Sequence, residues 1–316
     1  MNEREGEGQQ EGRQEGRPES KHRRMLLVAH TGRSDVDITA RKVAATLADA
    51  GIDLLASEGE RRELGLNPFE PTDETPDADG RSIEMVLAIG GDGTLLRAAE
   101  RARPLSAPIL GINLGRVGFL TEVDLDDLDE ALQAIVDRRY RVSSRMTVQV
   151  RVEHDGEFIT GGWALNEISV EKGSRERILD VVVEVDGHGV SAYGCDGVLC
   201  ATPTGSTAYT FSAGGPVLWP GVDALLIAPS NAHALFARSL VVSPESTVTV
   251  HIDPGGPTAI LVCDGRRAHE IPPGSRVHVC KGERPVMLVR LNEQTFTNRL
   301  VRKFKLPVHG WRDQRH

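Results

Sequence analysis

The chain has 316 residues, and its 39% hydrophobic and 26% charged residues are typical of a globular protein and exclude a chain that is disordered throughout. The formal net charge of −9 argues against a general nucleic-acid binder, because neutralising a run of phosphates needs a broad basic face. No apolar run approaches the roughly 20 residues that span a bilayer, and the polar N-terminus lacks the apolar core of a secretory signal, so we expect a cytoplasmic protein with neither nucleic-acid nor membrane partners.

Residues 1–24 are predicted to form a disordered tail. They contain no aliphatic side chain beyond Met1, so they cannot bury enough surface to offset the entropy of ordering the chain. The remaining chain is long enough for two domains, each with its own core.

An α/β domain is predicted over residues 25–139. Apolar strands are expected at 25–28, 52–56, 85–89 and 108–114, and helices at 36–50, 94–103 and 126–138. The acidic, Pro-rich segment 57–84 is expected to be a surface connection. Because the strands lack polar alternation and are separated by helices, they predict a parallel sheet that is covered on both faces.

A β-rich domain is predicted over residues 140–300, where apolar and polar residues alternate between turn signals such as Asp186-Gly187. Residues 202–216 interrupt this pattern and predict a loop that opens a short helix. The C-terminal segment 301–316 is expected to return to the first domain, with a short strand or a turn near 301–305.

The stretch Gly90-Gly91-Asp92-Gly93-Thr94 directly follows a predicted strand. Glycines at the carboxyl end of a parallel strand let a ligand approach the main chain, and the free N–H groups of the next helix favour phosphate. A carboxylate would repel phosphate, so we expect Asp92 to accept the proton of an attacking hydroxyl. The alternative is a tight turn in which Asp92 caps the helix. The stretch matches neither the Walker A pattern nor GxGxxG.

Two other segments add binding groups. The hydroxyls of Thr202, Thr204, Ser206 and Thr207, with exposed N–H groups, are expected to form a preformed binding edge before a short helix, although a Ser/Thr-rich surface loop is the alternative. Asn166-Glu167 offers an amide for an adenine edge and a carboxylate for a ribose diol. Taken alone, that dipeptide fits a turn at a strand end better than a binding pair.

Together, the GGDGT stretch, Asn166-Glu167 and residues 196–216 (DGVLCATPTGSTAYTFSAGGP) resemble the NAD kinase family, in order, over nearly the whole chain after the tail. GGDGT alone is shared with diacylglycerol and sphingosine kinases and with the phosphofructokinase-like superfamily, whereas TPTGSTAY is far more specific. The resemblance implies a phosphofructokinase-like α/β domain, a β-rich NAD-binding domain, and transfer of a phosphoryl group to the 2′-hydroxyl of the adenosine ribose of NAD, giving NADP.

The same resemblance implies roles for individual residues. Asp92 stands at the position of the catalytic base, and the phosphate-donor loop is Gly90, Gly91, Gly93 and Thr94. The implied substrate-binding residues are Gly93, Arg97, Asn166, Glu167, Arg177, Asp196, Thr207, Ala208, Tyr209, Thr210, Phe211 and Ser212. Arg266 stands where the family often has a glutamine contact.

The resemblance further implies NAD and ATP as substrates, inorganic polyphosphate as an open alternative donor, a divalent cation such as Mg²⁺, and a homodimer or homotetramer. Mg²⁺ on the donor phosphates would screen the repulsion between an acidic protein and its polyanionic ligands. Basic residues that could share this task are Arg97, Arg116, Lys172, Arg175 and Arg177. The four cysteines have no metal-ligand spacing, so no metal site built by the protein is expected.

Two alternatives stay open at this point. A lipid kinase would share GGDGT, but it should carry an apolar face or a basic amphipathic helix, and the sequence shows us neither. A non-catalytic NAD(H) sensor would keep Asn166-Glu167 and the hydroxyl-rich loop but would have little use for Asp92.

Overall fold

A computed structural model describes residues 23–65, 83–115, 118–174, 177–291 and 295–308. The predicted tail therefore lies outside the described residues except at its end, where the first strand begins at Arg23 rather than Met25. Arg23 is ordered because its guanidinium pairs with Glu84 (2.8 Å) and donates to two carbonyls of a neighbouring helix.

The first sheet has six strands in the order β2-β1-β3-β4-β18-β5. All neighbours are parallel except the last pair, in which β5 runs antiparallel to β18. The strands are β1 (Arg23–Ala29), β2 (Ile52–Leu55), β3 (Met85–Ile89), β4 (Ile109–Ile112), β5 (Arg141–Arg145) and β18 (Val286–Arg290). The predicted parallel sheet is thus present, with two strands from beyond residue 139.

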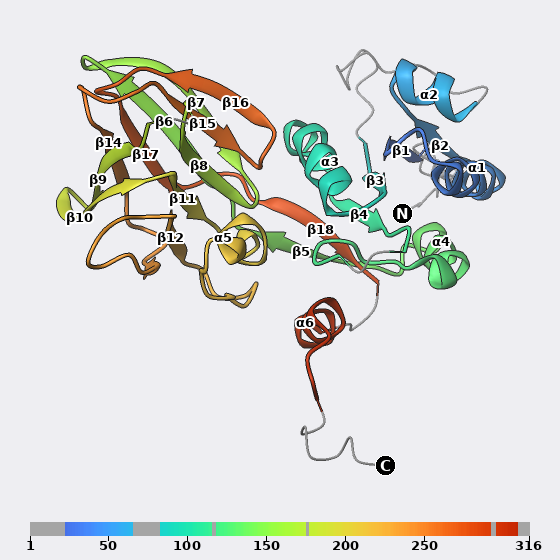
Figure 1. The fold of residues 1–316 in the computed structure, drawn as a ribbon. Coiled ribbons are helices and arrows are strands. Elements are labelled where there is room, and N and C mark those ends of the chain that lie inside the picture. The colour runs from blue at the N-terminus through green and yellow to red at the C-terminus, as the bar shows by residue number, and fades with distance from the viewer. Residues whose placement is uncertain (1–22, 66–82, 116–117, 175–176, 292–294, 309–316) are drawn as a thin grey trace, which may run out of the picture.

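Helices cover both faces of this sheet, as expected for strands without polar alternation. The described helices of this half are α1 (Ser34–Asp49), α2 (Glu58–Leu64), α3 (Asp92–Leu105), a 3-10 turn at Leu125–Asp127 and α4 (Leu128–Val136). The apolar stripes of α1 and α4 close a core on one face. On the other face, α3 packs in a second core that also takes Leu165 from the β-rich half, so α3 lies between the two halves (Figure 1).

The β-rich half is a sandwich of two antiparallel six-stranded sheets around one core (Figure 1). The sheet β10-β9-β14-β17-β6-β7 contains His188–Cys195, Leu179–Val185, Val248–Ile252, Arg276–Lys281, Val148–His154 and Glu157–Ala164. The sheet β13-β12-β11-β8-β15-β16 contains Leu240–Val242, Leu225–Ser230, Gly197–Ala201, Glu167–Lys172, Ala259–Cys263 and Arg267–Ile271. The loop predicted at 202–216 holds a 3-10 turn (Gly205–Thr207) and α5 (Tyr209–Ser212).

Three expectations from the sequence need correction. Segment 57–84 is not only a connection: α2 forms because Ser57 and Glu60 make a reciprocal capping box, while residues 66–82 lie outside the described chain. The expected boundary at 139/140 does not separate the sheets, because β5 and β18 return to the first one. The expected strand or turn near 301–305 is instead part of a helix, α6 (Phe296–Phe304).

The C-terminal helix α6 joins the two halves. Phe296 and Phe304 pack against Phe119 beside the first sheet, with ring centroids 5.9 and 5.7 Å apart. Phe304 also packs on Phe211 of α5, at 4.7 Å. Among the described residues, no helix is long and apolar enough to cross a membrane.

Candidate active site

The glycine loop follows β3 and ends where α3 begins, at Asp92. Gly90 has φ +151, and a Cβ there would collide with Thr94, so this position requires glycine. Gly91 and Gly93 are different, since an added Cβ would meet no atom of the described chain within 4 Å. Packing within the chain therefore does not explain these two glycines. They leave an open surface beside the free N–H groups of the α3 N-terminus, which suits a phosphate.

Asp92 faces a second loop across this open surface. Its two carboxylate oxygens accept hydrogen bonds from the backbone N–H groups of Phe119 and Leu120, each at 3.0 Å. A Cβ on Gly118 would collide with the same carboxylate. Each oxygen still has a further lone pair for a donor such as a substrate hydroxyl. The predicted alternative, a cap for the helix, is wrong: no side chain caps α3, and Asp92 holds the neighbouring loop.

Arg97 lies one turn further along α3 and contacts the end of β1. Its guanidinium donates to the Ala29 carbonyl (3.4 Å) and lies 3.6 Å from Glu60. Glu60 is buried and also pairs with Arg101 (3.1 Å). The Glu60 carboxylate is thus shared by the guanidinium groups of Arg97 and Arg101. These three side chains together carry a net positive charge near the glycine loop.

The pair Asn166-Glu167 lies at the start of β8 and is held by a buried carboxylate. Asp264 accepts hydrogen bonds from the N–H groups of Asn166 (2.7 Å) and Leu165 (3.0 Å), and it pairs with Arg267 (2.9 Å). The Asp264 N–H donates to the Glu167 carbonyl (2.9 Å). The turn after β15 therefore fixes the backbone that presents both predicted binding residues.

Glu167 is 5% exposed, and its carboxylate Oε2 has no hydrogen-bond partner in the described part of the chain. Burial is the main reason why the pKa of Glu167 rises to about 8; the nearby Asp264 adds to the rise, and the N–H of Tyr209 opposes it. A buried oxygen without a partner is costly, so the site is suited to a ligand that brings a donor. The two O–H groups of a ribose diol are such donors.

Asp264→Asn tests whether this turn positions the pair. Asparagine keeps one acceptor oxygen but turns an NH₂ group toward the second N–H and loses the ion pair with Arg267. For NAD, the substrate that the family resemblance implies, we expect KM to rise at least about tenfold and the pH dependence of binding to shift to lower pH, because a negative charge beside Glu167 is removed. Steady-state kinetics between pH 6 and 9 measure both effects.

Glu100→Gln is the matched control, because Glu100 approaches the same Arg267 (3.3 Å) but makes no hydrogen bond to the Asn166-Glu167 backbone. If Asp264→Asn leaves both KM and the pH profile unchanged, Asp264 has no positioning role.

The hydroxyl-rich loop is tied to this strand. Thr202 is fully buried; its hydroxyl donates to the Leu165 carbonyl (2.6 Å), and its N–H donates to the Asn166 carbonyl (2.9 Å). Ser206 is also fully buried and donates to the Pro203 carbonyl (2.7 Å). The expectation that these two hydroxyls line a binding edge is therefore wrong, because Thr202 ties the loop to the segment before β8 and Ser206 fixes the loop internally.

The predicted contact run 207–212 contains both buried and exposed side chains. Thr210 is fully buried and donates to the Gly205 carbonyl (2.6 Å). Tyr209 and Phe211 are each 40% exposed, and Ser212 is exposed as well. Thr207 and Ala208 are half-buried. The two aromatic rings are the large surfaces that this run offers to a ligand.

Other predicted residues lie apart from the glycine loop. Asp196 pairs with Lys172 (2.6 Å), which lowers the pKa of Asp196, and it accepts a hydrogen bond from Asn231 (2.9 Å). Lys172 is thus engaged by a carboxylate rather than open to phosphate, contrary to expectation. Arg177 is exposed. Arg116 and Arg175 lie outside the described residues.

The chain matches the family model of the ATP-NAD kinase N-terminal domain over residues 25–140 and that of the C-terminal domain over residues 165–291. The chain belongs to the NAD kinase family. This confirms the resemblance and the enzyme class predicted from the sequence.

Relatives that match over most of their own length are also NAD kinases. The chain is 52% identical to an NAD kinase of Mycolicibacterium paratuberculosis over 301 residues, covering 92% of this chain and 98% of the relative. It is 53% identical to an NAD kinase of Nocardia farcinica, covering 94% and 95%. It is 51% identical to NAD kinase 2 of Streptomyces coelicolor, covering 93% and 98%.

Solved NAD kinase structures have the same fold. Yeast NADH kinase in complex with NADH superposes with a TM-score of 0.80 at 20% identity, over 92% of this chain and 90% of the yeast chain. An NAD kinase from Archaeoglobus fulgidus in complex with ATP superposes with a TM-score of 0.68 at 27% identity, over 90% and 99%. The α/β half with its parallel sheet and the β-rich half are therefore the fold of this family.

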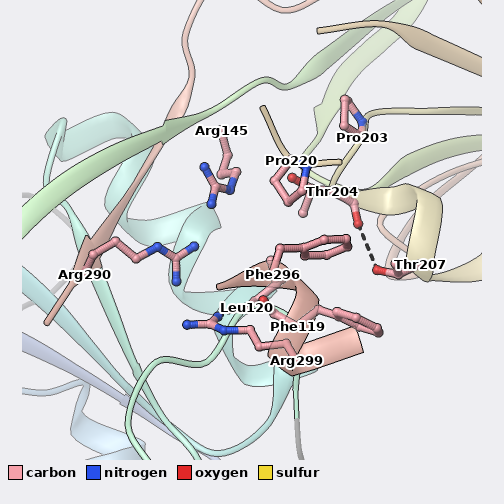
Figure 2. A pocket seen from close by; sticks show the side chains of 10 residues that line it. All are labelled: Phe119, Leu120, Arg145, Pro203, Thr204, Thr207, Pro220, Arg290, Phe296 and Arg299. Atoms are coloured by element: carbon pink, nitrogen blue, oxygen red, sulfur yellow. Dashed lines mark hydrogen bonds between the residues drawn. The ribbon is translucent and has the colours of Figure 1, made fainter. Parts of the chain in front are cut away.

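In this NAD kinase fold, one cavity between the halves is lined by the predicted loop 202–216 and by the residues that hold Asp92, whereas the glycine loop and Asn166-Glu167 are not among its lining residues (Figure 2). Phe119 and Leu120, whose N–H groups hold Asp92, line it on one side, and Thr204 and Thr207 line it on the other. The sequence did not predict the three arginines that also line this cavity, Arg145, Arg290 and Arg299. It also led us to Arg266 rather than to its neighbour Asp264. The Cys263-Asp264-Gly265 turn was the available signal for Asp264.

Proposed function

We propose that this chain transfers the terminal phosphoryl group of ATP to the 2′-hydroxyl of the adenosine ribose of NAD, giving NADP and ADP. The observation that carries this proposal is the Asp92 carboxylate, held by two N–H groups beside an open glycine loop at a helix N-terminus, in a chain of the NAD kinase family. Among the solved relatives, one holds NADH and another holds ATP.

In the proposed reaction, Asp92 accepts the proton of the 2′-hydroxyl as the ribose oxygen attacks the terminal phosphorus. A new bond from this oxygen to phosphorus forms, and the bond from that phosphorus to the ADP oxygen breaks. The N–H groups around Gly91 and Gly93 hold phosphate oxygens, and Arg97 adds positive charge nearby. Positioning and charge compensation thus come from the loop, and proton transfer from one carboxylate.

The adenosine of NAD is placed by the second half of the protein. The side-chain amide of Asn166 is suited to the adenine edge, and the Glu167 carboxyl to the ribose diol. The exposed rings of Tyr209 and Phe211 offer flat apolar surfaces for the nucleotide. Arg177 and Asp196 are proposed to contact more distant parts of the ligand.

A divalent cation, Mg²⁺ in our proposal, would be held by the donor phosphates. Such a cation takes its oxygen ligands from the phosphates and from water, so the proposal assigns it no side chain of this protein. When bound, it would neutralise charge on the transferring phosphates.

Further features of the proposal follow the family resemblance. Inorganic polyphosphate is an alternative donor. The described glycine loop offers contacts to phosphate, and none of its described features selects a nucleotide base. The proposal also includes a homodimer or homotetramer, a cytoplasmic location and a phosphofructokinase-like α/β half.

The lipid-kinase alternative is not supported. The basic helix α6, which the sequence interpretation did not find, has its aromatic residues Phe296 and Phe304 packed against rings of the protein rather than free for a membrane. A non-catalytic NAD(H) sensor would not need the Asp92 carboxylate or the space that Gly91 and Gly93 leave for a phosphate.

Incubation of the protein with NAD, ATP and Mg²⁺, followed by an enzymatic assay for NADP, tests this proposal. NADP should form only when all three are present, and inorganic polyphosphate in place of ATP decides the donor. Absence of NADP under saturating conditions would contradict the proposed function.

A further inference from the structure

The cavity between the two halves is lined by three arginine side chains. It measures about 80 Å³ and is lined by Phe119, Leu120, Arg145, Pro203, Thr204, Thr207, Pro220, Arg290, Phe296 and Arg299. Figure 2 shows the guanidinium groups of Arg145, Arg290 and Arg299 around one space, on side chains from β5, β18 and α6. Its volume is far below the roughly 300–1,000 Å³ of pockets for drug-sized ligands, so it suits one small group.

One carboxylate faces these three guanidinium groups. Oε2 of Glu122 accepts from Arg290 (2.6 Å) and from Arg299, and the Glu122 side chain is only 1% exposed. Arg145 makes no ion pair within the described residues, and its hydrogen bond goes to the carbonyl of its neighbour Ser144 (3.0 Å). Among the described residues, these three arginines and Glu122 therefore carry an excess of two positive charges.

This excess is costly in the protein without a ligand. Burial is the main cause that lowers the pKa of Arg145 to about 10, and the charges of Arg290 and Arg299 lower it further. Like charges in a partly buried site need a counter-charge. Since Glu122 is the one carboxylate that pairs with these arginines within the described part of the chain, the site is suited to an additional anion.

The cavity is adjacent to the proposed catalytic carboxylate. The side chains of Phe119 and Leu120 line it, while their N–H groups donate to Asp92. Arg299 donates to the carbonyl of Phe119 (3.1 Å), so the same loop residue connects the arginine cluster with Asp92. An anion in the cavity would therefore lie close to the site of phosphoryl transfer.

We propose that Arg145, with Arg290 and Arg299, forms a binding site for a phosphate group of high negative charge at the edge of the active site. This inference rests on the proposed function. The phosphate has two possible sources, the 2′-phosphate of the product and a terminal phosphate of the donor. Both carry oxygens suited to the forked N–H groups of arginine.

Arg145→Gln tests the site, because Arg145 can be removed without breaking the ion pairs of Glu122. Binding is measured by calorimetry in buffer free of phosphate and sulfate, with NADP, inorganic tripolyphosphate and NAD as separate ligands. We expect NADP or tripolyphosphate to bind at least about tenfold more weakly to the variant, and NAD to bind equally well. Weaker NADP binding identifies the product phosphate, and weaker tripolyphosphate binding identifies the donor phosphate.

Two controls separate this role from a structural one. Arg151→Gln removes an exposed arginine on β6, paired with Glu153 (2.9 Å), and should leave all three affinities unchanged. Arg145→Lys keeps the charge but loses the fork, and should weaken phosphate binding by less than glutamine does. Because repulsion is relieved, the ligand-free Arg145→Gln protein should melt at the same or a higher temperature than the wild type.

Equal affinities of the wild type and Arg145→Gln for both NADP and tripolyphosphate would overturn the inference. A lower melting temperature with unchanged phosphate binding would do the same, since the arginine would then be structural. The binding measurements need no turnover, so failure of this site is distinguished from failure of the kinase assay.

Discussion

Asp92→Asn should lower kcat for NADP formation by about 100-fold or more, because the amide cannot accept the proton of the 2′-hydroxyl. NAD affinity should stay close to that of the wild type, since the proposed adenosine contacts, Asn166 and Glu167, lie in the other half of the protein. Steady-state kinetics and calorimetry with NAD measure the two effects separately.

The structure adds a second consequence of this substitution. Asparagine can accept the N–H of Phe119 or of Leu120, but its own NH₂ group then faces the other N–H, so the loop should loosen. A loss of about 1–3 kcal/mol in the free energy of unfolding is expected from the unsatisfied donor. Thermal or urea unfolding followed by circular dichroism measures it.

Asp124→Asn is the matched control for the loop effect. Asp124 accepts from Asn113 (2.9 Å) and pairs with Arg302 (3.0 Å), and neither of these partners belongs to the glycine loop. The control should lose stability without a comparable loss of kcat. Turnover of Asp92→Asn at the wild-type rate would show that the carboxylate is not the base.

The second large effect concerns the pH dependence of NAD binding through Glu167. Below its pKa of about 8, this carboxyl holds a proton in the ligand-free protein, whereas the charge-assisted bond to a ribose diol needs the carboxylate. NAD affinity should therefore rise with pH, by up to about tenfold per unit, and level off above about pH 8. Calorimetry with NAD from pH 6 to 9 tests this.

Glu167→Gln should abolish that pH dependence and, at pH 8.5, weaken NAD binding by about 1.5–3 kcal/mol, which corresponds to about 10- to 150-fold. The neighbouring Glu171→Gln variant on β8 should keep the pH dependence. An equally steep pH profile in Glu167→Gln would assign the titration to another group.

The same carboxyl affects the stability of the ligand-free protein. Its pKa is raised from 4.5 to about 8 by folding, so the folded chain holds a proton that the unfolded chain releases above about pH 4.5. The stabilisation by this proton is complete below about pH 4.5 and is lost as the pH rises to about 8. Glu167→Gln should remove this component of the pH dependence.

Local patterns let the sequence predict part of the fold and site. The strand at 85–89, its glycine loop and the start of α3 lie within about 20 consecutive residues, so strand periodicity and glycine spacing suffice to predict them. The hydroxyls of Thr202 and Ser206 were assigned to a ligand because sequence cannot show which backbone carbonyl a side chain reaches. The family resemblance, by contrast, depends on residue identity and needed no geometry.

Contacts over long sequence distances could not be predicted. Asp264 reaches the N–H of Asn166 across 98 residues, and the cluster of Arg145, Arg290 and Arg299 comes from three separate elements. The return of β18 to the first sheet is of the same kind, since an apolar strand in a β-rich segment does not reveal which sheet it joins.

A crystal structure of the protein with NAD measures the central relationship directly, the distance from the Asp92 carboxylate to the ribose 2′-oxygen. We expect the two to lie within hydrogen-bond reach, about 2.6–3.2 Å, with the glycine loop open beside them for the donor phosphate. A ribose held well beyond the reach of Asp92, with its 2′-hydroxyl facing another group, would contradict the assignment of this carboxylate as the base.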